Sequence, residues 1–187
     1  MTLLIVGVTA FIGLHLIPYF AIGFRTGMVA KMGIGGYRGL FAVAVLASLA
    51  GIIFGWRSNT PDMLFVPPSW GFHVTPLFVL FGFILFFASQ APTNIKRYVR
   101  HPQMTGILLW SLGHLAANGE DRSIILFGGF ALWSVLAIYG ANRRDTEWQK
   151  PEKQSVIKDI ITVTIGLAMY ALVVYFHEAV IGVRPMP

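Results

Sequence analysis

Residues 3–24 read LLIVGVTAFIGLHLIPYFAIGF and contain no Asp, Glu, Lys or Arg. A membrane-spanning helix needs about 20 predominantly apolar residues, so this stretch is long enough to cross a bilayer. The first basic residue, Arg25, follows the apolar run. A cleavable signal peptide has the opposite polarity, with its basic residues before the run. The stretch therefore predicts a retained first transmembrane helix.

Five further apolar stretches follow along the chain. The fourth is short, but it begins after Pro102, which suits a first helical turn, and it ends at the turn-forming pair Asn118-Gly119. We therefore predict an all-α fold, a polytopic bundle of six transmembrane helices forming a single domain over residues 1–187. The expected spans are Leu3–Phe24, Gly39–Trp56, Trp70–Ser89, Gln103–Ala117, Ser123–Ala141 and Ile160–Ile181.

The composition supports a membrane protein. The chain has 187 residues, of which 56% are hydrophobic and 12% are charged. A soluble domain has about 45–50% apolar and about 25% charged residues, and a small one keeps much of its surface in water. Cysteine is absent, which excludes disulfides, thiolate metal sites and a cysteine nucleophile.

The basic residues alternate between the two sides of the expected bundle. The net charge is +6, and eleven of the 14 Lys and Arg residues fall in the first, third and fifth loops. Because cytoplasmic loops carry an excess of Lys and Arg, both termini are predicted to lie outside. The charge is thus explained by topology, and no nucleic-acid partner is expected. The eleven are Arg25, Lys31, Arg38, Lys96, Arg97, Arg100, Arg143, Arg144, Lys150, Lys153 and Lys158.

Glycines and polar residues suggest finer detail. Residues 33–36 are expected to form a Gly-rich loop, and the hydrophilic stretch Asn142–Asp159 is expected to be a cytoplasmic helical linker. Other glycines fall within the expected helices, where small residues permit close helix contacts. These are the pairs Gly51/Gly55, Gly106/Gly113 and Gly128/Gly129.

Two histidines lie well inside expected spans, where ionisable residues are costly and indicate function. His15 lies ~18–20 Å below the outer start of the first helix and His114 ~17–18 Å above the inner start of the fourth, at about 1.5 Å per residue. In a hydrocarbon core ~30 Å thick the two depths nearly match. Such a pair suits bis-histidine haem ligation, with Phe11 and Tyr19 flanking His15. The alternative is that each histidine only hydrogen-bonds a neighbouring helix.

The face around His114 carries small and aromatic residues at helical spacing. Gly106, Trp110, Gly113 and Ala117 lie on or beside it. Small residues there would let a flat ring approach the helix.

Other polar positions allow both a structural and a functional interpretation. His73 and His177 are expected at the outer membrane interface, where Glu178 beside His177 makes a metal site an alternative. Glu120 and Asp121 are expected to cap the next helix, where acidic residues favour the helix dipole.

Arg100-His101-Pro102 opens the fourth helix on the predicted cytoplasmic side. A helix N-terminus with an arginine nearby suits an anion or a carboxylate. The alternative is an interfacial basic anchor. The sequence contains no GxSxG, HExxH or CxxC motif and no pair of intramembrane carboxylates, which weakens the hydrolase and transporter classes.

Over nearly its whole length the chain resembles the NnrU family. The resemblance implies a role in nitrite and nitric oxide metabolism, and a relationship to the plant zeta-carotene isomerase, which binds haem b and isomerises a polyene. It also implies that His15 and His114 are the haem ligands and that His101, with Arg100, is the candidate catalytic site. The residues that carry it are His15, Gly36 to Phe41, Arg100 to Gly106, Trp110, His114-Leu115 and Asn118 to Glu120.

A more distant resemblance is to membrane methyltransferases of the isoprenylcysteine type, which bind S-adenosylmethionine and usually read RHPxYxG. Met104 replaces the tyrosine here and Gly106 is kept. Arg143, Arg144 and Glu147 would supply a downstream polar cluster. A third hypothesis is a non-enzymatic membrane assembly or sensor protein. The leading hypothesis remains a haem b protein of the bilayer that acts in nitric oxide or nitrite metabolism or on an apolar polyene.

The topology is testable with an alkaline phosphatase reporter, which is active only outside the cytoplasm. We expect activity when the reporter follows Pro187 and none when it follows Lys153, because the excess of basic residues holds that loop inside. An inactive alkaline phosphatase after Pro187, at a position where a reporter active only in the cytoplasm does work, would contradict the topology.

Overall fold

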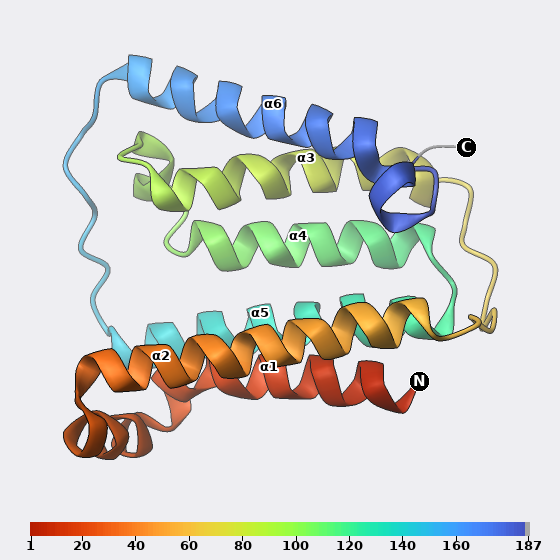
Figure 1. Ribbon diagram of the computed structural model, residues 1–187. Helices are drawn as coiled ribbons and strands as arrows, with labels where there is room; N and C mark the ends of the chain where they lie inside the picture. Colours follow the sequence, from red (N-terminus) through yellow and green to blue (C-terminus); the bar gives the residue numbers. More distant parts are fainter. Residues whose placement is uncertain (186–187) are drawn as a thin grey trace. The chain divides into compact units, whose positions relative to one another are not determined.

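The computed structural model describes residues 1–185 and is helical over most of that range (Figure 1). Two compact units make up the chain, residues 1–65 with 119–146 and residues 66–118 with 147–187. The elements are α1 (Thr2–Phe20), α2 (Ile22–Arg57), α3 (Gly71–Gln90), the 3₁₀ helix η1 (Asn94–Arg97), α4 (Pro102–Ala117), α5 (Asp121–Arg144) and α6 (Val156–Ile181).

The predicted all-α class is confirmed, and the apolar helices fit a membrane embedding. Five helices, α1, α2, α3, α5 and α6, are long and apolar enough to cross a bilayer. α4 has 16 residues, which span ~24 Å at about 1.5 Å per residue. The sixth span and the outward-facing termini stay predictions.

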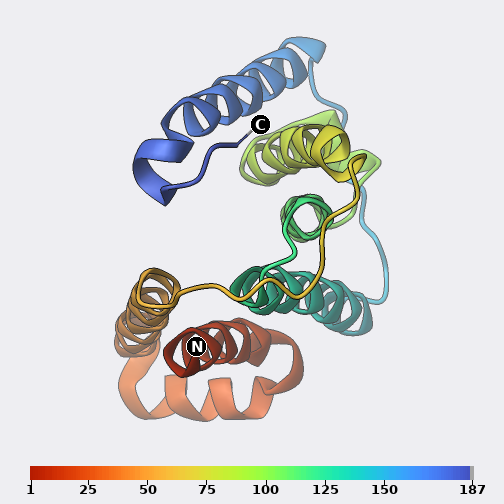
Figure 2. The ribbon, with the colours of Figure 1, turned by 90° about the vertical axis from the view of Figure 1, so that its right-hand side faces the viewer.

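The first expected loop is largely helical, so its prediction as a loop is wrong. α1 ends at Phe20, and α2 begins at Ile22 and runs on to Arg57. Gly33 alone interrupts α2, with φ 72° and ψ 166°, a backbone conformation that glycine adopts without steric cost. Residues 22–32 consequently lie across the axes of α1 and of the rest of α2 (Figure 2).

The helical linker expected over Asn142–Asp159 is also wrong in its central part. α5 ends at Arg144, and no helix forms again until Val156. Pro151 has no N–H to donate and its ring obstructs a helix. Its carbonyl instead accepts a hydrogen bond of 2.9 Å from Arg97.

A polar clasp in the second unit fastens this extended segment to η1. Asn94 and Gln154 exchange two hydrogen bonds of 2.9 and 2.8 Å. The Asp159 carboxylate accepts from the Thr93 hydroxyl and from the backbone and side-chain N–H groups of Asn94. Thr93 is almost wholly buried. The clasp thus joins the start of α6 to the chain between α3 and α4.

In the first unit α1 packs against both α2 and α5. A methyl group on Gly7 would lie 2.6 Å from the backbone nitrogen of Ile52, so only glycine allows this approach of α1 to α2. Leu4, Val8 and Ile52 form the buried cluster beside it. Gly51 and Gly55 contact α1 as predicted.

In the second unit α3 packs against both α4 and α6. Gly82 and Gly106 bring α3 and α4 together, because a methyl group on either would lie within 3.0 Å of the other's carbonyl oxygen. The Thr75 hydroxyl donates to the Gly113 carbonyl at 2.7 Å. The expected helix-contact role is thus confirmed for Gly106 and Gly113.

Of the third predicted pair, Gly129 contacts Val8 and Ile12 of α1. A methyl group added at Gly128 would meet no other atom of the described residues within 4 Å. The pair therefore contributes one contact residue and not two.

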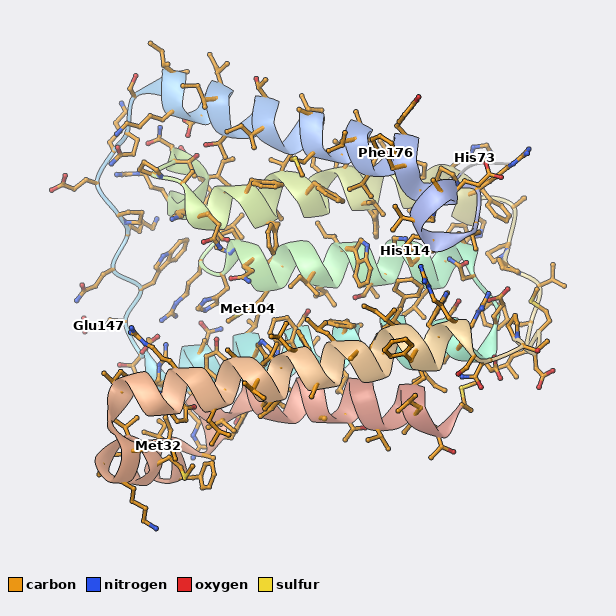
Figure 3. All side chains as sticks on the ribbon, in the orientation of Figure 1. Met32, His73, Met104, His114, Glu147 and Phe176 are labelled. Atoms are coloured by element: carbon orange, nitrogen blue, oxygen red, sulfur yellow. The ribbon has the colours of Figure 1, made fainter. Side chains whose placement is uncertain are left out.

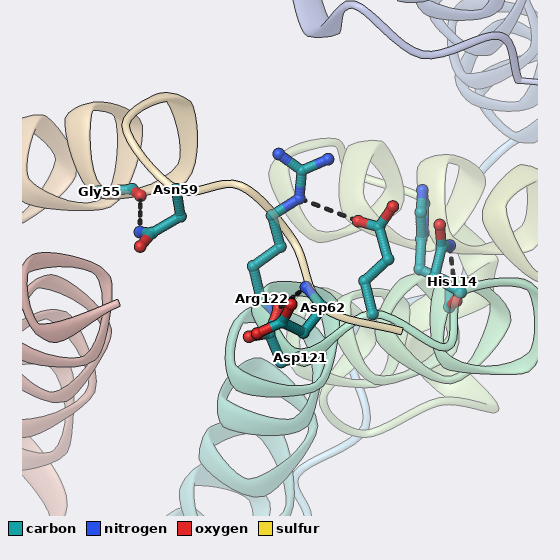
Figure 4. Close-up of polar contacts among 8 residues, drawn as sticks. Gly55, Asn59, Asp62, His114, Asp121 and Arg122 are labelled. Carbon is teal, nitrogen blue, oxygen red and sulfur yellow. Dashed lines mark hydrogen bonds and ion pairs between the residues drawn. The ribbon is translucent and has the colours of Figure 1, made fainter. Parts of the chain in front are cut away.

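The loop after α2 is tied to the start of α5 within the first unit (Figure 4). Asp62 and Asp121 exchange hydrogen bonds of 3.0 and 3.2 Å. Glu120 is the N-cap residue of α5 by position, but its carboxylate pairs with Arg122 at 2.9 Å and makes no cap hydrogen bond. Asp121 lies in the first turn, where a negative charge favours the helix dipole.

The glycine contact between α1 and α2 gives a stability prediction. Gly7→Ala is expected to lower the free energy of unfolding by about 1–3 kcal/mol, because overpacking forces two backbones apart. Gly13→Ala is the control. Gly13 lies on the same helix, and a methyl group added there would meet no atom within 4 Å, so this substitution should not lower the free energy of unfolding. Thermal unfolding of the two variants in detergent measures both effects, and equal melting temperatures would contradict the packing described.

Candidate functional site

His15 is half-buried in α1 and has one ring nitrogen fixed by its own helix. Nδ1 lies 2.8 Å from the Phe11 carbonyl oxygen. A carbonyl only accepts hydrogen bonds, so Nδ1 carries the proton and the neutral ring keeps its lone pair on Nε2. Metal-binding histidines are held in this way, with the second ring nitrogen donating to a carbonyl or carboxylate.

Aromatic rings surround His15 within the first unit. The Phe11 ring stacks on it at 4.1 Å between centroids, which confirms the predicted flanking contact. Phe41 and Trp133 approach edge-on at 5.5 and 6.1 Å. Sequence reasoning missed these two, because they lie on α2 and α5 and no local spacing relates them to His15.

Tyr19, the other predicted neighbour, is engaged elsewhere in the same unit. The guanidinium of Arg144 lies 5.3 Å from the centre of its ring, and its β-carbon faces Gly140 of α5. Tyr19 therefore packs α1 against α5 near their ends.

The indole N–H of Trp133 is buried and has no hydrogen-bond partner in residues 1–185. The side chain is 5% exposed. A buried donor left unpaired costs about 1–3 kcal/mol, and nearly all such groups in native proteins are paired. An unsatisfied donor beside the His15 ring fits a bound group that carries hydrogen-bond acceptors, as the carboxylates of haem b do.

His114 repeats the construction of His15 in the second unit. It lies in α4, and its Nδ1 is 2.8 Å from the Trp110 carbonyl oxygen, again four residues earlier. The Trp110 ring lies 5.0 Å from the imidazole, as predicted for this face. Asn118 donates to the His114 carbonyl at 2.8 Å and closes the end of the helix (Figure 4).

The glycines near His114 are not free to admit a flat ring. Gly106 faces Gly82 and Leu85 of α3, and Gly113 faces Phe78 of the same helix. Their small size is used for packing within the second unit, so the predicted use of these two positions by a cofactor is not supported. His15 belongs to the first unit and His114 to the second. The matched depth of the two rings stays a sequence-based prediction.

Arg100 and His101 lie immediately before α4, where the sequence placed a polar site. His101 is the N-cap residue, with φ −126° and ψ 68°, and its carbonyl accepts from the Thr105 amide at 3.0 Å. Pro102 is the first helical residue, as expected. Both Arg100 and His101 are half-buried and take part in further contacts.

The residues expected to form a polar cluster for a methyltransferase lie at the end of α5 and just after it. Arg143 and Arg144 are in the last turn of the helix, and Glu147 comes three residues after Arg144. Arg144 is paired with Asp145 at 2.7 Å. The role of this cluster stays a prediction.

The outer histidines do not form a metal site in the described part of the chain. His177 is bonded through Nδ1 to the Val183 carbonyl at 2.7 Å, and Glu178 pairs with Arg184 at 3.2 Å. His73 is exposed (Figure 3). Across residues 1–185 no group of three or more His, Cys, Asp or Glu residues is arranged to hold a metal ion.

Comparison with known proteins confirms the family resemblance over almost the whole chain. A family model described as NnrU protein matches residues 3–185. No curated protein and no solved structure matches this chain.

Proposed function

This chain belongs to the NnrU family, and on that premise we propose that it is a haem b-binding integral membrane protein with His15 and His114 as iron ligands. One observation carries the proposal: both imidazoles donate from Nδ1 to the carbonyl four residues earlier, each at 2.8 Å. Metal-binding histidines are oriented in this way, with the second ring nitrogen donating to a carbonyl or carboxylate.

The surroundings of the two rings support the same conclusion. Ionisable side chains inside membrane helices are costly and mark functional positions. Each imidazole also lies against an aromatic ring from its own helix, Phe11 or Trp110. The unpaired indole N–H of Trp133 adds a donor beside His15.

Haem b, when bound, supplies an iron whose reduction potential depends on its axial ligands and on burial. The chain's own residues fix the two imidazole orientations and keep water away with apolar helices. We propose that the protein acts in nitrite or nitric oxide metabolism in a bacterial inner membrane, or in cis–trans isomerisation of an apolar polyene. A polyene would enter from the lipid that surrounds the exposed apolar helix faces.

We assign Arg100 and His101 a separate role at the start of α4. The N-terminus of a helix favours negative charge, and an arginine beside it strengthens that preference. These residues would hold an anionic or carboxylate group of a substrate or partner, apart from the iron ligands.

Absorption spectroscopy of the detergent-purified protein tests the haem ligands. We expect a Soret band and sharp α and β bands on reduction, and loss of the bis-histidine spectrum in His15→Ala and in His114→Ala, because each removes one Nε2 ligand. His73→Ala and His177→Ala are matched controls and should keep the spectrum.

A colourless protein from haem-replete cells would refute the proposal. Thermal stabilisation of that colourless protein by S-adenosylmethionine would favour the methyltransferase hypothesis, and no stabilisation would favour a non-enzymatic role.

The separate role of Arg100 and His101 predicts a different result. Arg100→Gln and His101→Gln should keep the haem spectrum and lose the activity, by about 10²–10⁴-fold if His101 transfers a proton. Haem content and turnover measured on the same preparations distinguish the two effects. Loss of haem in either variant would place these residues in the cofactor site instead.

A further inference from the structure

The segment 22–32 is a helix that lies across the other helices of the first unit. Only Ala21 separates it from the end of α1, and it stops before Gly33, where α2 changes direction. Figures 1 and 2 show it transverse to α1 and to the later part of α2, and Figure 3 labels Met32 at its end. Because α1 and α2 are each long and apolar enough to span a bilayer, a helix across their shared end would be oriented along the membrane surface.

One face of this transverse helix carries its largest apolar side chains. Phe24, Met28 and Met32 follow one another at a spacing of four residues, which places them on the same side. Phe24 is 58% exposed and Met32 40% exposed. The opposite face carries the smaller side chains of Thr26 and Ala30, and Ile22, 47% exposed, lies at its edge.

Basic residues accompany this apolar face. Lys31 lies seven residues after Phe24, two turns along the helix, so it borders the same face. Arg25 lies over the buried Tyr37 ring at 5.7 Å from its centre. Arg38 is exposed just beyond Gly33. No acidic residue occurs between Met1 and Arg57.

We propose that residues 22–32 form an in-plane helix that binds the anionic phospholipid surface on the predicted cytoplasmic side. Phe24, Met28 and Met32 enter the boundary between headgroups and acyl chains, and Lys31 and Arg38 contact the lipid phosphates. Amphipathic helices with basic residues bind bilayers in this way, and the cytoplasmic leaflet supplies the matching negative charge. The proposal is independent of haem binding.

Spin labelling tests the proposal cleanly because the full chain contains no cysteine. Single labels at Phe24→Cys and Thr26→Cys report opposite faces of the helix, since the two positions are about 160° apart around its axis. The protein is reconstituted in phosphatidylcholine vesicles with or without phosphatidylglycerol, and label accessibility to oxygen and to a water-soluble nickel chelate is measured. Val43→Cys, 64% exposed in α2, is the lipid-facing reference, and Glu152→Cys is the reference in water.

We expect the label at residue 24 to match the oxygen-rich, nickel-poor level of the label at 43, and the label at 26 to match that at 152. Adding Lys31→Gln and Arg38→Gln should abolish any deepening of the residue-24 label that phosphatidylglycerol produces. Nickel accessibility at 24 equal to that at 152 in both vesicle types would overturn the proposal. So would spin–spin broadening between residue-24 labels on two copies, since it would show that a second chain covers this face.

Discussion

Hydrocarbon offers no hydrogen-bond partners, and most features of this molecule follow from that constraint. Backbone groups must be paired within the chain, which explains why most of the described residues form helices. The same constraint acts on the imidazoles of His15 and His114. Each pairs its Nδ1–H with a carbonyl of its own helix, four residues earlier, which fixes the orientation of the ring. A requirement for satisfied donors thereby produces a potential metal ligand in each unit.

Helix packing follows from the absence of a hydrophobic driving force between helices in lipid. Close backbone approach replaces that force, and small residues make it possible. Gly7 allows it between α1 and α2, and Gly82 with Gly106 allows it between α3 and α4. The hydroxyl of Thr75 adds a hydrogen bond across the second contact. The glycines that a flat cofactor was expected to use are therefore already occupied by a neighbouring helix.

Much of this fold could be predicted from the sequence, because the apolar runs and the residues that end them are local signals. Pro102 and Asn118 bound α4 as expected. The errors lie where local polarity suggested a loop or a helix and the backbone did otherwise. The Gly33–Gly36 stretch was expected to be a loop, but only Gly33 departs from helical geometry. Residues 145–155 were expected to be helical, but Pro151 and the clasp around Asn94 keep them extended. At the candidate site, Phe11 and Trp110 were predictable from their spacing to the histidines. Trp133 was not, because only tertiary packing brings α5 to His15.

The proposed chemistry requires that one iron be bound by both histidines at once. Pulsed electron paramagnetic resonance of the oxidised protein, prepared with ¹⁵N-labelled histidine, counts the imidazole nitrogens coupled to the iron. Ligation by both side chains predicts two coupled histidine nitrogens, with one lost in His15→Ala and the other in His114→Ala. A haem signal with no coupled histidine nitrogen, or with couplings that survive both substitutions, would contradict it.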